Sequence, residues 1–281
     1  MATNITLTSG MRSNLYSLQQ TANLMELTQK RMATGKRVQT AIDDPIAFFT
    51  SRGHEQRAGD LAVRKDEMSE SVQLLKAADT GINSILNLIA NAKSLAQSAL
   101  SGETTTAINT MELQFNEVLS QIDTVAADSN YKGINLLDDT SITHEVKFDE
   151  TGDSKLAITG FDAESEGATL SLATTVANDW VSAGGTADKL EINSAITKLD
   201  DAVSALRSEA SKLSTNLSII TSRQDFTSNM INTLKDGAAN LVNADMNEEG
   251  ANMLMLQTRQ ALGTTSLSLA AQAAQSVLRL F

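Results

Sequence analysis

The chain has 281 residues, 34 acidic and 22 basic side chains, a formal net charge of −12 and no cysteine. The acidic balance argues against a nucleic-acid-binding protein, and the lack of cysteine excludes disulfides and thiolate metal sites. One proline and 4% aromatic residues favour long, uninterrupted helices, none with the composition of a membrane span.

The first predicted element is a helix over residues 1–33, and we expect no Sec-type signal peptide before it. Its apolar side chains recur in steps of four and three, as a seam between helices requires. They are Met11, Leu15, Leu18, Ala22, Met25 and Met32. A connector over 34–44 follows and leads to Asp44 and Pro45, which read as the N-cap and first residue of the next helix. The connector and cap residues are Gly35, Arg37, Asp43, Asp44 and Pro45.

Residues 45–137 read as the N-terminal part of a helical bundle. One long helix ends at Ser101-Gly102, and a shorter helix ends near Asp128. The residues that we assign to the core of this part are Leu75, Ile82, Leu86, Ile89, Phe115 and Ile122.

Residues 138–187 change character, because short stretches of alternating polar and apolar residues are separated by glycines. We predict strands at 145–148, 155–158 and 168–172. The sequence therefore indicates a β-rich insertion in an otherwise helical protein.

The strongest periodic signal lies in residues 188–242, where apolar residues alternate in steps of four and three for about seven heptads. Asp188 followed by Glu191 resembles a capping box at its start. Its predicted core residues are Ile196, Leu199, Val203, Leu206, Leu213 and Leu217. The fold class that we predict is mainly α: a long, coiled-coil-like bundle with a small β-hairpin insertion, plus a pair of N- and C-terminal helices.

Residues 243–281 read as a connector and a last helix that is apolar to its end. Burying the six large apolar residues after position 266 is worth about 9–18 kcal/mol. Ordering residues 267–281 costs about 20 kcal/mol. We therefore expect these ends to be disordered in the monomer and to order on assembly. The predicted contact residues here are Leu267, Ala270, Ala274, Val277, Leu278 and Phe281.

The residue types of an active site do not come together in this sequence. The two histidines, His54 and His144, share no metal-ligand spacing, and no nucleophile–base pattern or phosphate-binding loop is present. Asp43 and Asp44 are better explained by helix capping than by acid–base chemistry. We expect no catalytic residue, cofactor or metal.

Several motifs, in order along the chain, resemble those of bacterial flagellin. They are Ala33-Thr-Gly-Lys-Arg-Val38 with Asp43-Asp44-Pro45 and Ala47; Phe115-Asn116, Ile122-Asp123, Asn130-Tyr-Lys-Gly133 and Leu136-Leu137; and Ala244-Asp245-Met-Asn-Glu248-Glu249 with Gln275-Ser-Val-Leu278. The matches cover about residues 1–137 and 190–281.

This resemblance implies a secreted structural subunit that self-assembles into the extracellular flagellar filament used for motility. Its partners would be further copies of itself, the flagellar type III export apparatus, an export chaperone, and the filament cap and junction proteins, without nucleic acid or membrane. The terminal helices would line the filament core, and the middle segment would face outward. Because Leu95-Ala96 follows Asn91, Lys93 and Ser94 instead of an arginine-rich stretch, we expect weak or absent recognition by the innate receptor TLR5.

The sequence leaves other functions to be weighed. A hook–filament junction protein looks similar at both ends and also assembles without enzymatic activity. A chemoreceptor-type coiled-coil hairpin would need heptads mirrored about a central tip, but the β-rich insertion occupies the midpoint. An enzyme on a helical scaffold has no support from the search for site residues.

Overall fold

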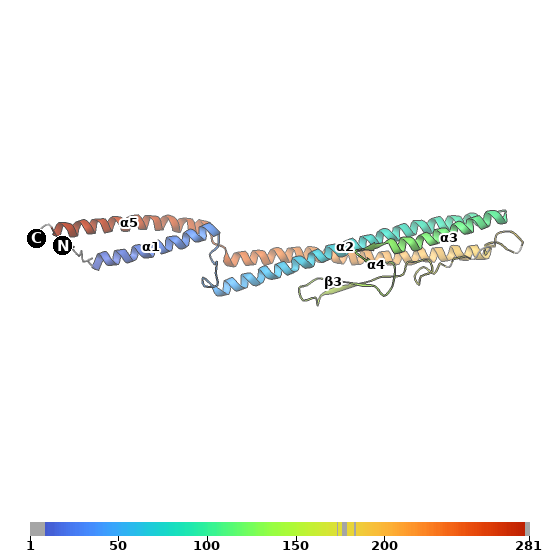
Figure 1. Ribbon diagram of the computed structural model, residues 1–281, viewed down its shortest axis with the longest axis horizontal. Helices are drawn as coiled ribbons and strands as arrows, with labels where there is room; N and C mark the ends of the chain where they lie inside the picture. The colour runs from blue at the N-terminus through green and yellow to red at the C-terminus, as the bar shows by residue number, and fades with distance from the viewer. Residues whose placement is uncertain (1–8, 173, 176–178, 183, 279–281) are drawn as a thin grey trace. The chain divides into compact units, whose positions relative to one another are not determined.

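The computed structural model describes residues 9–172, 174–175, 179–182 and 184–278, and in these ranges the chain is mainly helical (Figure 1). The helices are α1 (Ser9–Thr34), α2 (Pro45–Leu100), α3 (Thr105–Asp128), α4 (Lys189–Val242) and α5 (Met246–Leu278). The strands are β1 (Asn130–Tyr131), β2 (Ile134–Asn135), β3 (Thr143–Lys147) and β4 (Lys155–Thr159). The predicted class, mainly α with a small β insertion and a terminal helix pair, is confirmed.

The contacts of the chain divide it into two compact units. Unit 1 consists of Met1–Gln56 and Thr233–Phe281, and unit 2 of Arg57–Asn232. The division falls inside α2 and α4, so each of these helices supplies residues to both units.

Side chains that accept hydrogen bonds from the first free backbone N–H groups fix where the helices begin. The Asp44 carboxylate accepts from the Ala47 amide at 3.0 Å, which places Pro45 in the first turn of α2, where its missing N–H costs nothing. Asp188 accepts from the Leu190 amide at 3.0 Å at the start of α4. The start of α5 is capped in the same way by Asp245, which accepts from the Asn247 amide at 2.8 Å.

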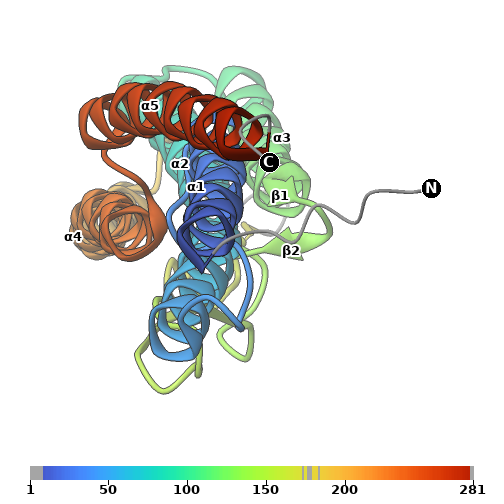
Figure 2. The same ribbon diagram turned by 90° about the vertical axis from the view of Figure 1, so that its left-hand side faces the viewer.

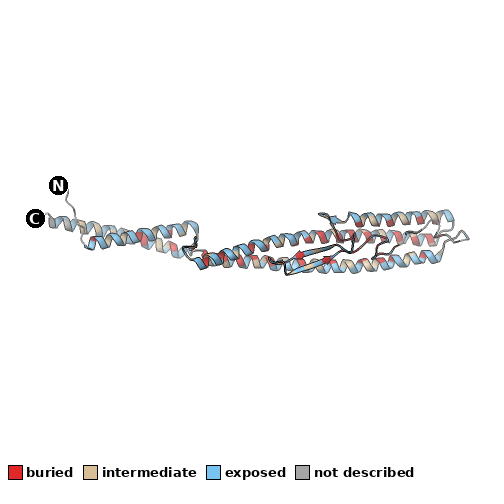
Figure 3. Cartoon of the chain, turned by 60° about the horizontal axis from the view of Figure 1, so that its bottom comes forward, coloured by how far each residue is buried: buried red, intermediate tan, exposed pale blue. Residues whose placement is uncertain are grey.

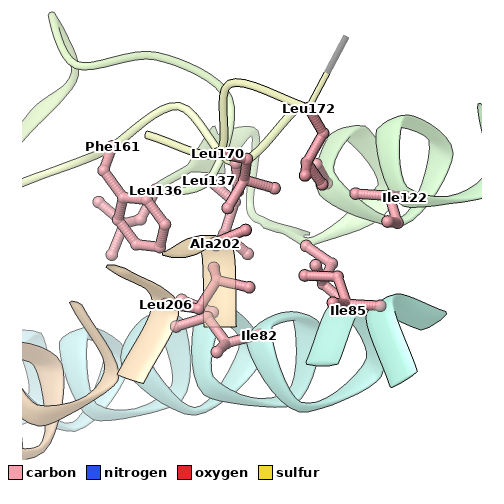
Figure 4. Close-up of a cluster of buried hydrophobic side chains, with 14 of the residues drawn as sticks. Ile82, Ile85, Ile122, Leu136, Leu137, Phe161, Leu170, Leu172, Ala202 and Leu206 are labelled. Carbon is pink, nitrogen blue, oxygen red and sulfur yellow. The ribbon is translucent and has the colours of Figure 1, made fainter. Parts of the chain in front are cut away.

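Unit 2 has a continuous apolar core between α2, α3, α4 and the insertion (Figures 3 and 4). Ile82 and Ile85 of α2 lie in it with Leu206 of α4, and all three are fully buried. Eight of the predicted core residues are buried: Leu75, Ile82, Ile89, Phe115, Ile122, Leu199, Leu206 and Leu213. The other four, Leu86, Ile196, Val203 and Leu217, are partly buried against the same cluster.

Two antiparallel hairpins make up the described β structure. The β1–β2 turn contains Lys132 and Gly133, both with positive φ (52° and 81°), which is the geometry of a tight type I′ connection. In the second hairpin the register pairs Val146 with Leu156, so that alternate side chains of β3 and β4 face the helices.

The third predicted strand, Ala168–Leu172, is wrong, because these residues form turns. The backbone of this segment makes its hydrogen bonds within the loop. The Ser171 amide donates to the Gly167 carbonyl, and the Leu172 amide donates to the Ser165 carbonyl. Leu170 and Leu172 are both buried in the core. The apolar alternation thus reflects burial of a loop and not pairing with a neighbouring strand.

A row of polar side chains on α3 holds the irregular part of the insertion in place. The Asn116 amide oxygen accepts from the Thr175 amide at 3.0 Å and from its hydroxyl at 3.1 Å, and its amide nitrogen donates to the Thr175 carbonyl at 2.9 Å. Asp123, seven residues later, accepts from the Ser165 amide at 2.6 Å. Next to the Asn116 attachment, Trp180 packs on Phe115, with ring centroids 4.9 Å apart.

His144 joins the second hairpin to α2, since its Nε2 lies 2.9 Å from the Ser71 hydroxyl. That hydroxyl already donates its single proton to the Glu67 carbonyl at 2.9 Å, so His144 must be the donor in this contact. Burial lowers the pKa of His144 below its ordinary value, so the fold favours the neutral ring.

We predict that Asn116→Ala will lower the free energy of unfolding of unit 2 by about 1–3 kcal/mol, because it leaves polar groups of a part-buried loop without partners. Trp180 is the one tryptophan of the chain, so its fluorescence during urea unfolding reports on this unit. Gln121→Ala on the exposed face of α3 serves as the control and should change stability by less than about 0.5 kcal/mol. Equal effects of the two substitutions would contradict the anchoring role of Asn116.

Candidate functional site

The terminal helices α1 and α5 pack along each other in unit 1 as an antiparallel pair (Figures 1 and 2). Two polar contacts fix their register: Asn14 donates to the Ser266 hydroxyl at 3.1 Å, and Arg31 donates to the Glu249 carboxylate at 3.1 Å. Between them Gly263 lies so close to Leu18 that an added Cβ would stand 2.6 Å from a Leu18 methyl group. The pairing therefore has one specified alignment.

The seam between α1 and α5 is only weakly apolar. Among the described side chains of the two helices, the buried large apolar residues are Met11 and Leu256. The other buried positions are polar, namely Thr21, Thr28 and Glu249. Polar seams specify an alignment but release little free energy on burial, so the pair gains register more than stability from these contacts.

The ion pair between Arg31 and Glu249 lies at the connector end of the helix pair. The Glu249 side chain is only 8% exposed, so the Arg31 guanidinium compensates a carboxylate that is largely removed from water. Asp245 is occupied in capping α5. Two carboxylates of the acidic segment that opens α5 thus have structural roles within this chain.

A second apolar stripe runs along α5 on the face away from α1. Leu254, Leu262 and Leu269 are 67%, 67% and 62% exposed. At 100° per residue, Leu254, Leu262 and Leu269 lie about 160°, 120° and 140° around the helix from the buried Leu256. Ala251, Met255, Thr258 and Arg259 line a shallow, mostly apolar surface together with Leu254 and Leu262. We call Leu254, Met255, Leu262 and Leu269 the outer stripe of α5.

Helix α1 also presents large apolar side chains to solvent. They are Leu15, Tyr16, Leu24 and Leu27, each between 39% and 64% exposed. At 100° per residue these side chains are distributed around the helix, with Leu24 on the opposite side from Leu15. Both helices of the pair thus have apolar surface that the pair itself leaves uncovered.

The sequence-predicted contact residues divide between the seam and the outer surface. Met11 is buried; Leu18, Met25, Met32, Leu267 and Ala270 are partly buried; Leu15 and Ala22 are exposed. The side chains of Ala274, Val277 and Leu278, and all of Phe281, lie outside the described residues. Sequence reasoning missed Thr21 and Thr28 in the seam, and it also missed most of the outer stripe. The repeat of apolar residues at 254, 262 and 269 was the signal for that stripe.

The two connectors of unit 1 bond to each other through their backbones. The Arg37 and Val38 amides donate to the Val242 carbonyl at 2.8 and 3.1 Å, and the Ala244 amide donates to the Gly35 carbonyl at 2.9 Å. Gly35 has φ 67°, a left-handed conformation that ends α1 without strain. The Arg37 side chain donates to the Leu241 carbonyl at 3.3 Å.

Asp43 holds the turn before α2. One of its carboxylate oxygens, Oδ2, accepts from the Gln39 and Thr40 amides at 3.0 and 2.9 Å and from the Thr40 hydroxyl at 3.1 Å. These hydrogen bonds lower the pKa of Asp43, and the largest contributions come from the Thr40 amide and then the Gln39 amide. The carboxylate is therefore ionised at neutral pH.

The described residues contain no cluster of three or more histidine, aspartate or glutamate side chains placed to bind a metal ion. Among the helices that the structure describes, none combines the length and apolarity needed to cross a bilayer. His54 lies in unit 1 and His144 in unit 2.

Comparisons with known proteins point to one family. Residues 6–141 match the bacterial flagellin N-terminal helical region, and residues 196–281 match the bacterial flagellin C-terminal helical region. The whole chain is 28% identical to a flagellin of Brucella melitensis over 99% of that protein, and 27% identical to flagellin FljM of Caulobacter vibrioides over all of it. A crystal structure of Bacillus cereus flagellin matches with a TM-score of 0.45 and 19% identity, covering 57% of this chain and 88% of that one.

The two family regions together span most of the chain, at both of its ends. The relatives named above are flagellins along their whole length, which favours a filament subunit over a hook–filament junction protein. The chain therefore belongs to the bacterial flagellin family, and it is a structural subunit of the flagellar filament, not an enzyme.

Proposed function

We propose that this subunit polymerises by seating the outer stripe of α5 and the exposed apolar residues of α1 against the terminal helices of neighbouring copies. The observation that carries the proposal is the pair of apolar faces on α5. One of these faces meets α1 of the same chain, whereas the other is exposed. A helix that is apolar on opposite sides is stable only between two partners, and in a homopolymer the second partner is another copy.

We also propose that the terminal helices become fully ordered on assembly. With Met11 and Leu256 as its buried large apolar residues among those described, the α1–α5 seam offers little to offset the conformational entropy of two helices of 26 and 33 residues. Weakly held ends suit a chain that is exported unfolded, and contacts with neighbours then complete the burial. In this proposal the interface residues predicted from the sequence contact neighbouring copies, and these include the ones outside the described part of the chain.

In this proposal the segments of the chain take separate places in the filament. Residues 1–33 and 243–281 form the inner core, with 34–44 as a connector. Residues 45–137 and 188–242 form the surrounding bundle, and 138–187 form the outward surface. The gap between the two family regions, 142–195, supports the last assignment, since it marks the segment that the family shares least.

The route to this location is part of the same proposal. We infer that the chain is secreted through the flagellar type III export apparatus with an export chaperone, and that it assembles beneath a filament cap onto junction proteins. The proposal rests on membership of the flagellin family, whose members form the extracellular filament.

We predict that Leu254→Asp with Leu262→Asp will abolish polymerisation or raise the critical concentration at least about 100-fold. Each leucine loses about 1.5 kcal/mol or more of burial, and 1.4 kcal/mol corresponds to a factor of ten. Sedimentation of seeded filaments measures the critical concentration. The control, Gln257→Asp with Ser268→Asp, adds the same charge to exposed flanks of α5 and should change it much less. Equal critical concentrations for the leucine double variant and this control would contradict the proposal.

Removal of residues 262–281 is a second arm of this experiment. The truncated chain should keep the Trp180 fluorescence of folded unit 2, because that unit has its own core. It should form no filaments at any concentration tested. Long filaments from the truncated chain would show that the terminal helices do not drive assembly.

Recognition by TLR5 is proposed to be weak or absent. Lys93, the basic residue of the stretch before Leu95-Ala96, is paired with Asp200 of α4. Asn91 and Ser94, beside it, are uncharged. We predict that purified monomer will give little or no signal in TLR5 reporter cells at concentrations that saturate the response to an activating flagellin. A potent response would refute this.

A further inference from the structure

The start of α2 and the turn before it form an unusually exposed apolar surface in unit 1. Ile42, Ile46 and Phe49 are 94%, 80% and 65% exposed. Steps of four and three place Ile46 and Phe49 on one side of the helix, with Ile42 in the turn that precedes them. Isolated exposed apolar residues are ordinary, but three large ones within eight positions mark an interaction site. We call Ile42, Ile46 and Phe49 the connector knob.

Unit 2 contains a cavity of about 180 Å³ between α2, the β3–β4 turn and α4. Its lining includes the acidic Asp149 and Glu150, and six further residues: the apolar Leu61, Phe148, Phe226 and Met230, and the basic Arg57 and Arg223. Phe226 is more than half exposed. The cavity is smaller than the sites that hold cofactors or drug-sized molecules, but it has room for a large side chain. We call these six residues the socket.

The cavity lining carries charges of both signs, and Arg223 is the arginine of the socket whose charge is available to a carboxylate of another copy. Arg57 is paired with Glu150 at 2.7 Å, but Arg223 lies over the Phe148 ring, 5.2 Å from its centroid, and has no ion-pair partner among the described residues. Beside the knob, the ionised carboxylate of Asp43 uses Oδ2 for its turn. The other carboxylate oxygen of Asp43, Oδ1, accepts no hydrogen bond from the described residues. One site thus presents a cation beside a cavity, and the other presents an anion beside exposed apolar side chains.

A helical filament requires contacts between two different surfaces of the same chain, because a surface that pairs with its own copy closes into a dimer. The knob and the socket are two such surfaces. We propose that the connector knob of one copy docks into the socket of a second copy, with Asp43 facing Arg223. This inference rests on the proposed assembly of the chain and adds a contact outside the terminal helices.

Cysteine cross-linking tests this contact, because the chain has no cysteine of its own. Ile46→Cys and Met230→Cys are made in separate chains, mixed in equal amounts, polymerised on seeds and treated with a short bis-maleimide. Each chain has one thiol, so a product joining the two variants must be intermolecular. The control replaces Ile46→Cys with Leu190→Cys, which is equally exposed (78%) but lies at the start of α4.

We expect covalent dimers from polymerised Ile46→Cys with Met230→Cys, at least about fivefold more than from the unpolymerised mixture or from the Leu190→Cys control. Filaments that form normally without this cross-link, or with equal cross-linking in the control, would refute the docking of the knob into the socket. The proposed assembly through the terminal helices would be unaffected. Failure of the unmodified chain to form filaments would instead refute the proposed function, and the inference with it.

A charge substitution gives an independent readout. Arg223→Ala should raise the critical concentration of polymerisation about three- to tenfold, whereas Arg207→Ala, which removes another exposed arginine of α4, should leave it unchanged. Trp180 fluorescence confirms that unit 2 of both variants is folded. Equal critical concentrations for the two variants would contradict the pairing of Arg223 with an acidic residue of a neighbour.

Discussion

Helix α5 has apolar side chains on two different faces, and one chain supplies a helix for only one of them. The seam with α1 takes the face that contains Leu256, and the outer stripe with Leu254 and Leu262 stays in water. This imbalance makes the isolated subunit incomplete. It gives the protein a reason to assemble that needs no ligand, no metal and no chemical step.

Unit 2 has the opposite character. Its core joins α2, α3, α4 and the insertion, and it buries Trp180 and Phe115 together with the isoleucines of α2. Polar anchors such as Asn116 fix the irregular loops without the help of another chain. In the proposed assembly, unit 2 folds before polymerisation and unit 1 is completed by it.

Sequence reasoning succeeded where the signals are local. The predicted caps at Asp44 and Asp188 each involve residues two or three positions apart, and the long heptads of α4 predict the length of that helix. It failed at residues 168–172, because alternating apolar residues look the same in a strand and in a buried loop. The contact between Asn116 and Thr175 joins positions far apart in sequence and has no local signature.

The candidate site was predicted in outline and not in detail. Apolar terminal helices were visible in the sequence, but the seam of α1 turned out to use Thr21 and Thr28 in place of Leu15 and Ala22. Threonine is counted as polar when apolar periodicity is assessed, so only the structure shows that Thr21 and Thr28 are buried in the seam. The outer stripe was overlooked because a second apolar stripe on α5 obscures the simple one-sided pattern.

Hydrogen exchange of the backbone amides of α1 and α5, compared between monomer and filament, tests the central claim most directly. If assembly completes these helices, their amides should exchange rapidly in the monomer and be strongly protected in the filament, while the core amides of α2 and α4 are protected in both. Equal protection of α1 and α5 in both states would contradict the account, because it would mean that the pair is already stable without neighbours.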